Sequence, residues 1–62
     1  MKFAIFSPRL DGYWKEDGTI RHNWKKARVF LSREDAEAYL KWIETEHKHA
    51  VICQDLIVEQ VE

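Results

Sequence analysis

Cysteine, proline and glycine are scarce in this 62-residue chain, which has one, one and two of them. A single cysteine, Cys53, excludes an intramolecular disulfide framework. The chain contains no glycine-rich phosphate loop, no nucleophile elbow and no zinc-protease motif. No stretch approaches the ~20 apolar residues of a membrane span, and the N-terminal apolar run, broken by Pro8, is too short for a secretory signal. We therefore predict a cytosolic protein without a membrane segment.

Large apolar side chains, by contrast, are abundant. Apolar residues make up 45% of the chain, and the aromatic ones are three tryptophans, two tyrosines and three phenylalanines. A chain of this length forms one domain, so residues 1–62 are a single unit. A domain this small buries only ~60% of its unfolded surface. We therefore expect some of the aromatic surface to be covered by a protein partner or by a second copy of the chain.

The net charge of -1 hides an uneven distribution along the chain. Residues 1–28 carry seven basic and three acidic side chains, whereas residues 29–62 carry three basic and eight acidic ones. The two halves can attract each other within the fold, or present differently charged faces to a partner.

The clearest local signal is a helix from Arg33 to about Glu46. Ser32 has the chemistry of an N-cap, because its hydroxyl can accept a hydrogen bond from the backbone N–H of Asp35. No glycine or proline interrupts the segment. Apolar positions recur at helical spacing and define one face. This face comprises Ala36, Leu40, Ile43 and His47.

Extended segments flank this helix on both sides. The first, Lys2 to Ser7, is apolar at both alternating sets of positions, which predicts a strand in a central position of the sheet or one covered on both faces. Asp17-Gly18 predicts a hairpin with a two-residue type I′ turn. The alternation of the last segment changes phase near Gln54-Asp55, which predicts a bulge or a break there. The other predicted strands are Gly12 to Glu16, Thr19 to Trp24, Ala27 to Leu31 and about Ala50 to Val61.

These elements predict an α+β fold of order β-β-β-α-β. We expect one curved, mostly antiparallel sheet with a single helix packed across one face. The last strand is expected beside the first, and its direction, parallel or antiparallel, is left open.

The order of motifs resembles small uncharacterised domains of phage and bacterial genomes. An apolar strand and a G-Y-W strand precede the pattern W-x-x-A-x-V-F-x-S-x-E-x-A and a helix. The matching residues are Gly12, Tyr13, Trp24, Ala27, Val29, Phe30, Ser32, Glu34 and Ala36. The resemblance implies a fold and an origin in a mobile element, and it implies no activity and no functional residues.

Metal binding and catalysis have few candidate residues. His47, His49 and Cys53 are zinc ligands by type, with His22 as a fourth, but no paired ligand spacing is present. Cys53, His22 and Asp55 are the residue types of a nucleophile, a base and an orienting group. Cys53 lies in an apolar run, which raises rather than lowers a thiol pKa. We therefore predict no metal, no cofactor and no enzymatic activity.

A basic, aromatic segment suggests nucleic-acid binding as an alternative function. Cations beside aromatic rings can hold a phosphate backbone and stack bases. The chain as a whole lacks the strongly basic composition usual for such proteins. The candidate residues are Trp14, Arg21, Trp24, Lys25, Lys26 and Arg28.

Protein binding is the function that the sequence favours. Ala38 and Trp42 lie one helical turn apart, away from the apolar face, with Tyr39 between them. A tryptophan beside a tyrosine is typical of an interface centre, although Trp42 can equally cover the core of a thin domain. We predict a non-enzymatic protein–protein interaction module that contacts a protein partner or forms a homodimer, through this helix face or a strand edge. The resemblance extends this to an accessory or inhibitor protein of a phage or mobile element.

Overall fold

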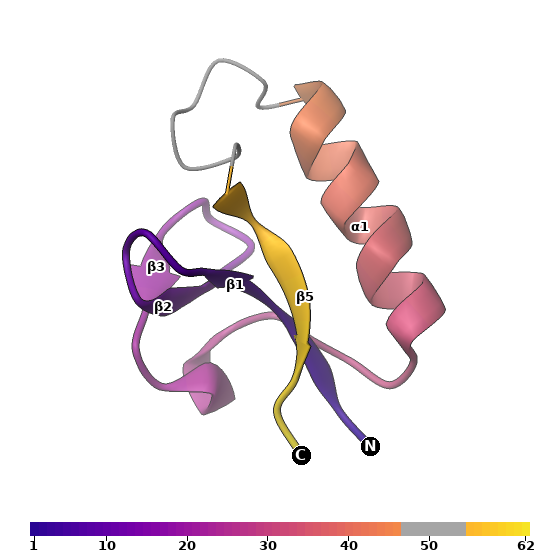
Figure 1. The fold of residues 1–62 in the computed structure, drawn as a ribbon, viewed down its shortest axis with the longest axis horizontal. Helices are drawn as coiled ribbons and strands as arrows, with labels where there is room; N and C mark the ends of the chain where they lie inside the picture. Colours follow the sequence, from indigo (N-terminus) through magenta and orange to yellow (C-terminus); the bar gives the residue numbers. More distant parts are fainter. Residues whose placement is uncertain (47–54) are drawn as a thin grey trace.

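The computed structural model describes residues 1–46 and 55–62. Within these residues, the elements are five strands, one α-helix and the 3-10 helix η1. Figure 1 shows their arrangement. In order, they are β1 (Phe3–Ser7), β2 (Gly12–Trp14), β3 (Ile20–Arg21), η1 (Trp24–Lys26), β4 (Val29–Phe30), α1 (Arg33–Glu46) and β5 (Ile57–Gln60).

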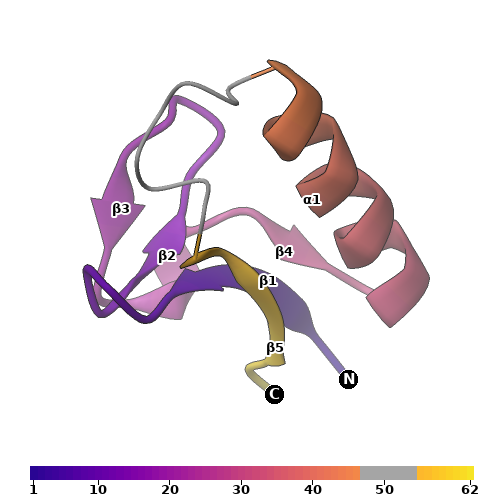
Figure 2. The same ribbon diagram turned by 45° about the horizontal axis from the view of Figure 1, so that its top comes forward.

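Strand β1 is the centre of the sheet, and β2, β4 and β5 all pair with it in antiparallel orientation. Strand β5 pairs with β1 along its length from Phe3 to Phe6. A strand has two hydrogen-bonding edges, so β2 and β4 share the other edge, β4 at the first half of β1 and β2 at the second (Figure 2). The Arg28 N–H donates to the Trp14 carbonyl at 3.0 Å and joins these two short strands. Strand β3 extends the sheet beyond β2.

The predicted α+β class is confirmed, with one helix on a mostly antiparallel sheet. The structure has four strands before the helix, which equals the number of extended segments predicted there and is one more than the order β-β-β-α-β contains. The last strand lies beside the first, as expected, and its direction is antiparallel. Strands β4 and β5 therefore run parallel to each other with β1 between them, and α1 is the crossover that connects them.

Helix α1 has the bounds that the sequence predicts. The Asp35 N–H donates to Ser32 Oγ at 3.1 Å, so Ser32 is the N-cap. Ala36 and Ile43 are fully buried, and Leu40 is partly buried against them. The fourth residue of the predicted face, His47, lies outside the described residues.

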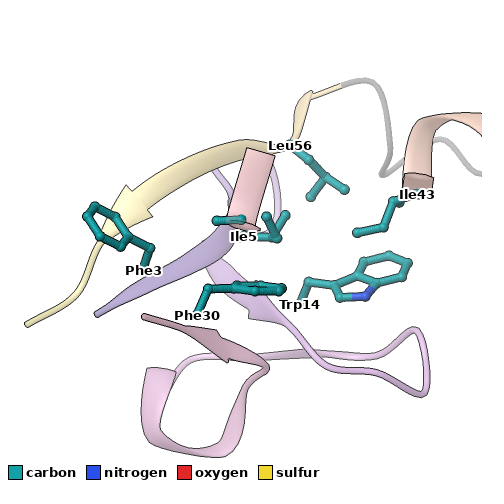
Figure 3. Packing of buried hydrophobic residues seen from close by; sticks show 7 residues of the cluster. Phe3, Ile5, Trp14, Phe30, Ile43 and Leu56 are labelled. Atoms are coloured by element: carbon teal, nitrogen blue, oxygen red, sulfur yellow. The ribbon is translucent and has the colours of Figure 1, made fainter. Parts of the chain in front are cut away.

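The core lies between α1 and the sheet (Figure 3). Side chains of Ile5, Ile43 and Leu56 gather around the ring of Trp14, which is 2% exposed. Leu56 and Val58 both pack on this core, as the shifted alternation of the last segment indicates. The complete core is Phe3, Ile5, Trp14, Phe30, Ala36, Ile43 and Leu56.

The predicted type I′ turn is wrong. Such a turn needs positive φ at both central residues, and in the described hairpin Gly18 has a φ of 87° while Asp17 has no positive φ. Lys15 N–H donates to the Thr19 carbonyl at 2.9 Å, and Gly18 N–H donates to the Lys15 carbonyl at 3.0 Å. This is the hydrogen-bond pattern of a three-residue loop with glycine at its last position.

The returning strand is also shorter than predicted, because it ends at Arg21. Asn23 Oδ1 accepts a hydrogen bond from the Lys25 N–H at 3.0 Å and begins η1. Asparagine side chains compete in this way with strand hydrogen bonding. Trp24 therefore lies in a helical turn and not in a strand.

The end of the chain is tied to its beginning. The Lys2 carbonyl accepts from the N–H groups of both Val61 and Glu62, at 2.8 and 3.3 Å, which is the pattern of a β-bulge. The predicted bulge near Gln54-Asp55 falls partly outside the described residues, as does the predicted strand before Asp55. The two termini consequently lie side by side (Figure 1).

Candidate binding surfaces

The sheet has a second face, opposite α1, which we call the open face. Side chains alternate between the two faces of a strand, so the residues next to the core positions point to this side. The strand registers bring one set of these residues together from all five strands. The open face comprises Ala4, Phe6, Tyr13, Arg21, Val29, Ile57 and Glu59.

Four of these residues form one row across the sheet. Phe6 is opposite Ile57 on one side and Tyr13 on the other, and Tyr13 is opposite Arg21. The rings of Phe6 and Tyr13 have centroids 5.0 Å apart and are tilted by 52°. Such a tilted pair is a favourable aromatic arrangement. The row therefore runs from an aliphatic side chain through two packed rings to a cation.

Contacts between side chains support the assignment of this face. Tyr13 Oη donates to Glu59 Oε1 at 3.4 Å, so the two residues project from the same side of the sheet. Desolvation and the neighbouring Glu59 carboxylate raise the pKa of the Tyr13 phenol above its ordinary value. Lys2 Nζ lies 5.9 Å from the centroid of the Trp24 ring, and η1 therefore borders the face at the N-terminal end of β1.

Much of the open face is accessible. Ile57 is 47% exposed, and Phe6, Tyr13 and Val29 are partly exposed. Ala4, by contrast, is fully buried. In the described part of the chain, α1 is the one helix longer than three residues, and it covers the opposite face.

The predicted protein-binding residues lie on the outer side of α1. Trp42 is 49% exposed and Ala38 is exposed, whereas Tyr39 is partly buried against the core. The Tyr39 ring lies 5.2 Å from that of Phe30 and 5.4 Å from that of Trp42. Trp14 Nε1 donates to Tyr39 Oη at 3.4 Å. Tyr39 is thus the link between the core and a half-exposed tryptophan.

The predicted nucleic-acid residues do not form one surface. Trp14, which was expected to stack on a base, is a core residue and is inaccessible. Arg28 pairs with Glu16, and its guanidinium lies 5.1 Å from the centroid of the Phe30 ring. Arg21 lies on the open face. Of the six candidates, the two lysines and Trp24 remain together, in η1.

A shallow groove separates the β2–β3 loop from the segment that leads into β4. Its charges are mixed, because Glu16 and Asp17 lie among the three cations. An anionic ligand therefore meets carboxylates as well as basic groups there. The groove is lined by Lys15, Glu16, Asp17, Lys26, Ala27, Arg28 and Val29.

The metal and catalytic candidates are mostly outside the described residues, namely His47, His49 and Cys53. Within residues 1–46 and 55–62, no three potential ligands gather into a metal-binding group. His22 Nδ1 lies 4.0 Å from an Asp11 carboxylate oxygen, with both side chains exposed. Asp55 forms an ion pair with Arg9 at 2.8 Å.

Comparison of the chain with protein-family models, with curated proteins and with solved structures gives no match. Among the described helices, none has the length and apolar character needed to cross a membrane. Function must therefore be argued from the surfaces themselves. Sequence reasoning did not select Phe6, Tyr13 or Ile57, although the apolar character of both sides of the first strand was a signal for a second contact face.

Proposed function

We propose that this chain is a non-enzymatic protein-binding module and that its open face is the principal docking surface. The observation that carries the proposal is the row of Ile57, Phe6 and Tyr13, which crosses three strands on the side of the sheet away from α1. A sheet of a small domain normally covers an apolar face with another layer. A protein partner supplies that layer here.

The chemistry of the face suits a protein better than a small molecule. Partly exposed rings and an aliphatic side chain form its centre, and a cation and a carboxylate, Arg21 and Glu59, lie toward its edges. Protein interfaces combine an aromatic and apolar centre with a polar rim in the same way. Large exposed apolar patches on small domains commonly mark such contacts.

The helix surface around Ala38, Tyr39 and Trp42 is a second contact region in this proposal. The resemblance to small phage and bacterial domains supports a role as an accessory or inhibitor protein of a mobile element. Action in the cytoplasm, which the sequence predicts, is part of the same proposal.

The proposal is tested by photo-crosslinking in cells that produce the protein. A photoreactive residue replaces Ile57, which is on the open face. In a separate variant it replaces Glu44, which is exposed on α1 and, two residues after Trp42, points away from the second contact region. We expect discrete protein adducts from position 57 and few from position 44. Equal labelling at both positions, or none at position 57, would overturn the proposal.

Nucleic-acid binding is the second candidate, favoured by the exposed pair Lys25 and Lys26 beside the half-buried ring of Trp24. This function requires retention on single-stranded DNA or RNA at low salt that falls steeply as salt is added. Replacing both lysines by glutamate should abolish it. A wild-type protein that is not retained at low salt would exclude this candidate.

A further inference from the structure

Resting on the proposed function, we infer that the partner of the open face is a second copy of this chain. The two copies pack sheet against sheet through this face, and each α1 lies on the outside of the dimer. The order of side chains across the sheet makes this face complementary to itself.

Charges of opposite sign lie at opposite edges of the open face. Glu59 is on β5 and Arg21 is on β3, the two outermost strands of the path β5-β1-β2-β3. Among the described residues, neither side chain forms an ion pair. Glu59 accepts a hydrogen bond from Tyr13 Oη, and Arg21 Nη1 donates one to the Ile20 carbonyl. The Arg21 side chain is exposed. Two charges of opposite sign on one face are therefore available for contacts with another molecule.

The apolar residues lie between these charges. Phe6 on β1 and Tyr13 on β2 are direct cross-strand neighbours, with Ile57 beyond Phe6 and Arg21 beyond Tyr13. The line midway between β1 and β2 thus has one ring on each side. It also lies about equally far from β5 and from β3, since neighbouring strands are ~4.8 Å apart.

A two-fold axis parallel to the strands, lying above this line and midway between the two packed sheets, builds the dimer. The rotation places each Phe6 over the Tyr13 of the second copy and each β5 over the β3 of the second copy. Arg21 then faces Ile57 of the other chain, and its long side chain reaches Glu59, one step of two residues further along β5. Each interface contains this pair twice, as required of a contact related by two-fold symmetry.

An interface of standard size takes up a substantial share of the surface of so small a chain. A standard interface removes ~800 Å² from each partner, which is about one fifth of the 4209 Å² surface of this chain. Packed sheets lie ~10 Å apart with their strands nearly aligned, a geometry that rings of the size of Phe6 and Tyr13 can fill. The contact also covers the half-exposed side chain of Ile57.

The test is sedimentation equilibrium of the intact chain over a range of concentrations, together with charge-reversal variants. We expect the wild type to move from the 7.5 kDa monomer to twice that mass as concentration rises. Arg21→Glu leaves two carboxylates facing each other at both ends of the interface, and Glu59→Arg leaves two guanidinium groups there. Each single variant should raise the dimer dissociation constant at least about tenfold, because like charges then meet at two places.

The decisive sample is an equal mixture of the two single variants. In a mixed dimer, the carboxylate introduced by Arg21→Glu in one chain meets the guanidinium introduced by Glu59→Arg in the other. At the second end of the interface, Arg21 of the Glu59→Arg chain meets Glu59 of the Arg21→Glu chain, and both of these residues are unchanged. The mixture should therefore form dimers that neither variant forms alone, and the double variant should recover self-association. Lys41→Glu and Glu37→Arg make the same kinds of charge reversal on exposed positions of α1 and should leave the mass unchanged.

Several outcomes would overturn the inference. A wild type that stays monomeric up to about 1 mM would do so, since weaker association is negligible. An Arg21→Glu variant that dimerises like the wild type would also overturn it. The dimer would then form elsewhere, for example through the edge of β5 that does not pair with β1, where Arg21 is outside the contact. Mixed variants that stay monomeric while each keeps the wild-type circular dichroism spectrum would contradict the proposed symmetry. If the chain is strictly monomeric but position 57 crosslinks to another protein, the proposed function stands. Only the inference of a dimer is then ruled out.

Discussion

At the scale of single residues, close contacts in the structure leave little freedom for substitution. Gly12 on β2 is buried against β3, and a Cβ at this position would lie 2.4 Å from Ile20 Cγ2 and 3.0 Å from the Arg21 carbonyl oxygen. Contact with a backbone atom is relieved only by moving the strand. The glycine is therefore needed for the approach of β3 to β2.

We accordingly expect Gly12→Ala to lower the free energy of unfolding by about 1–3 kcal/mol, the usual cost of overpacking. The measurement is urea unfolding of the variant and the wild type. Gly18→Ala is a useful comparison, because its Cβ meets no atom within 4 Å but its φ of 87° strains an L side chain. An unchanged midpoint for Gly12→Ala would mean that the strands separate more easily than the contact indicates.

Tyr39 and Trp42 differ in how far each belongs to the core. Tyr39 touches the Phe30 ring and accepts from Trp14 Nε1, whereas Trp42 is 49% exposed. We expect Tyr39→Ala to destabilise the fold more than Trp42→Ala, which should cost about 1 kcal/mol through the lost ring contact and buried area. Thermal unfolding of both variants gives this comparison.

If Trp42→Ala unfolds the protein, Trp42 is a core residue and the predicted contact region on α1 is lost. If the variant stays folded, its association and crosslinking can be compared directly with those of the wild type. The matched control on the same helix is Glu44→Ala, which changes an exposed residue outside this region without removing a ring.

At the scale of elements, the bounds predicted for α1, about Arg33 to about Glu46, agree with the structure, and the strands are predicted less well. The helix has local signals, since Ser32 caps its own first turn and Ala36 and Ile43 are spaced for one face. Strand ends depend on pairing with distant segments, and here Asn23 captures the backbone N–H of Lys25 and ends the extended conformation early. The dipeptide Asp17-Gly18 fits both two-residue and three-residue loops, so its turn type follows from strand register.

The β2–β3 loop carries a pH-dependent contribution to stability. The Asp17 carboxylate accepts from the Thr19 N–H at 3.0 Å and from Thr19 Oγ1 at 2.6 Å, and these hydrogen bonds lower the pKa of Asp17 below 3.8. A lowered pKa in the folded state means that the contribution is present above the unfolded pKa. It is lost as the pH falls through the folded pKa.

We therefore expect Asp17→Ala to unfold at a lower temperature than the wild type at pH 7, and the two melting curves to converge below pH 3.8. Thermal melts at several pH values measure this difference. Thr19→Val removes the Oγ1 donor while keeping the backbone donor, and should show a smaller effect of the same sign. A difference that grows toward low pH would contradict the assignment.

At the scale of the whole molecule, the uneven charge along the chain has a structural consequence. Lys2 pairs with Glu62 at 3.4 Å and Arg9 with Asp55 at 2.8 Å, so cations of the basic half meet carboxylates of the acidic half. These pairs are exposed and each contributes little to stability. The same uneven distribution places Arg21 and Glu59 at the two edges of the open face. This placement depends on the strand order and cannot be predicted from the sequence.

The candidate sites illustrate the same limit of sequence reasoning. The predicted hairpin groups Trp14 with the basic residues. In the structure, the alternation of side chains along β2 places the Trp14 ring in the core. Phe6 and Tyr13 come together only through the pairing of β1 with β2. The apolar first strand predicts a central position or cover on both faces, and β1 is the central strand, with α1 over one of its faces.

The most direct test of the account is to record amide NMR spectra of the wild type at increasing concentration. If the open face is the contact surface, shifts should centre on Phe6, Tyr13 and Ile57, and the exposed residues Lys41 and Thr45 of α1 should stay unchanged. Concentration-dependent shifts centred on α1 would contradict the account. Spectra that do not change up to about 1 mM would rule out the dimer and leave the open face as a docking surface for another protein.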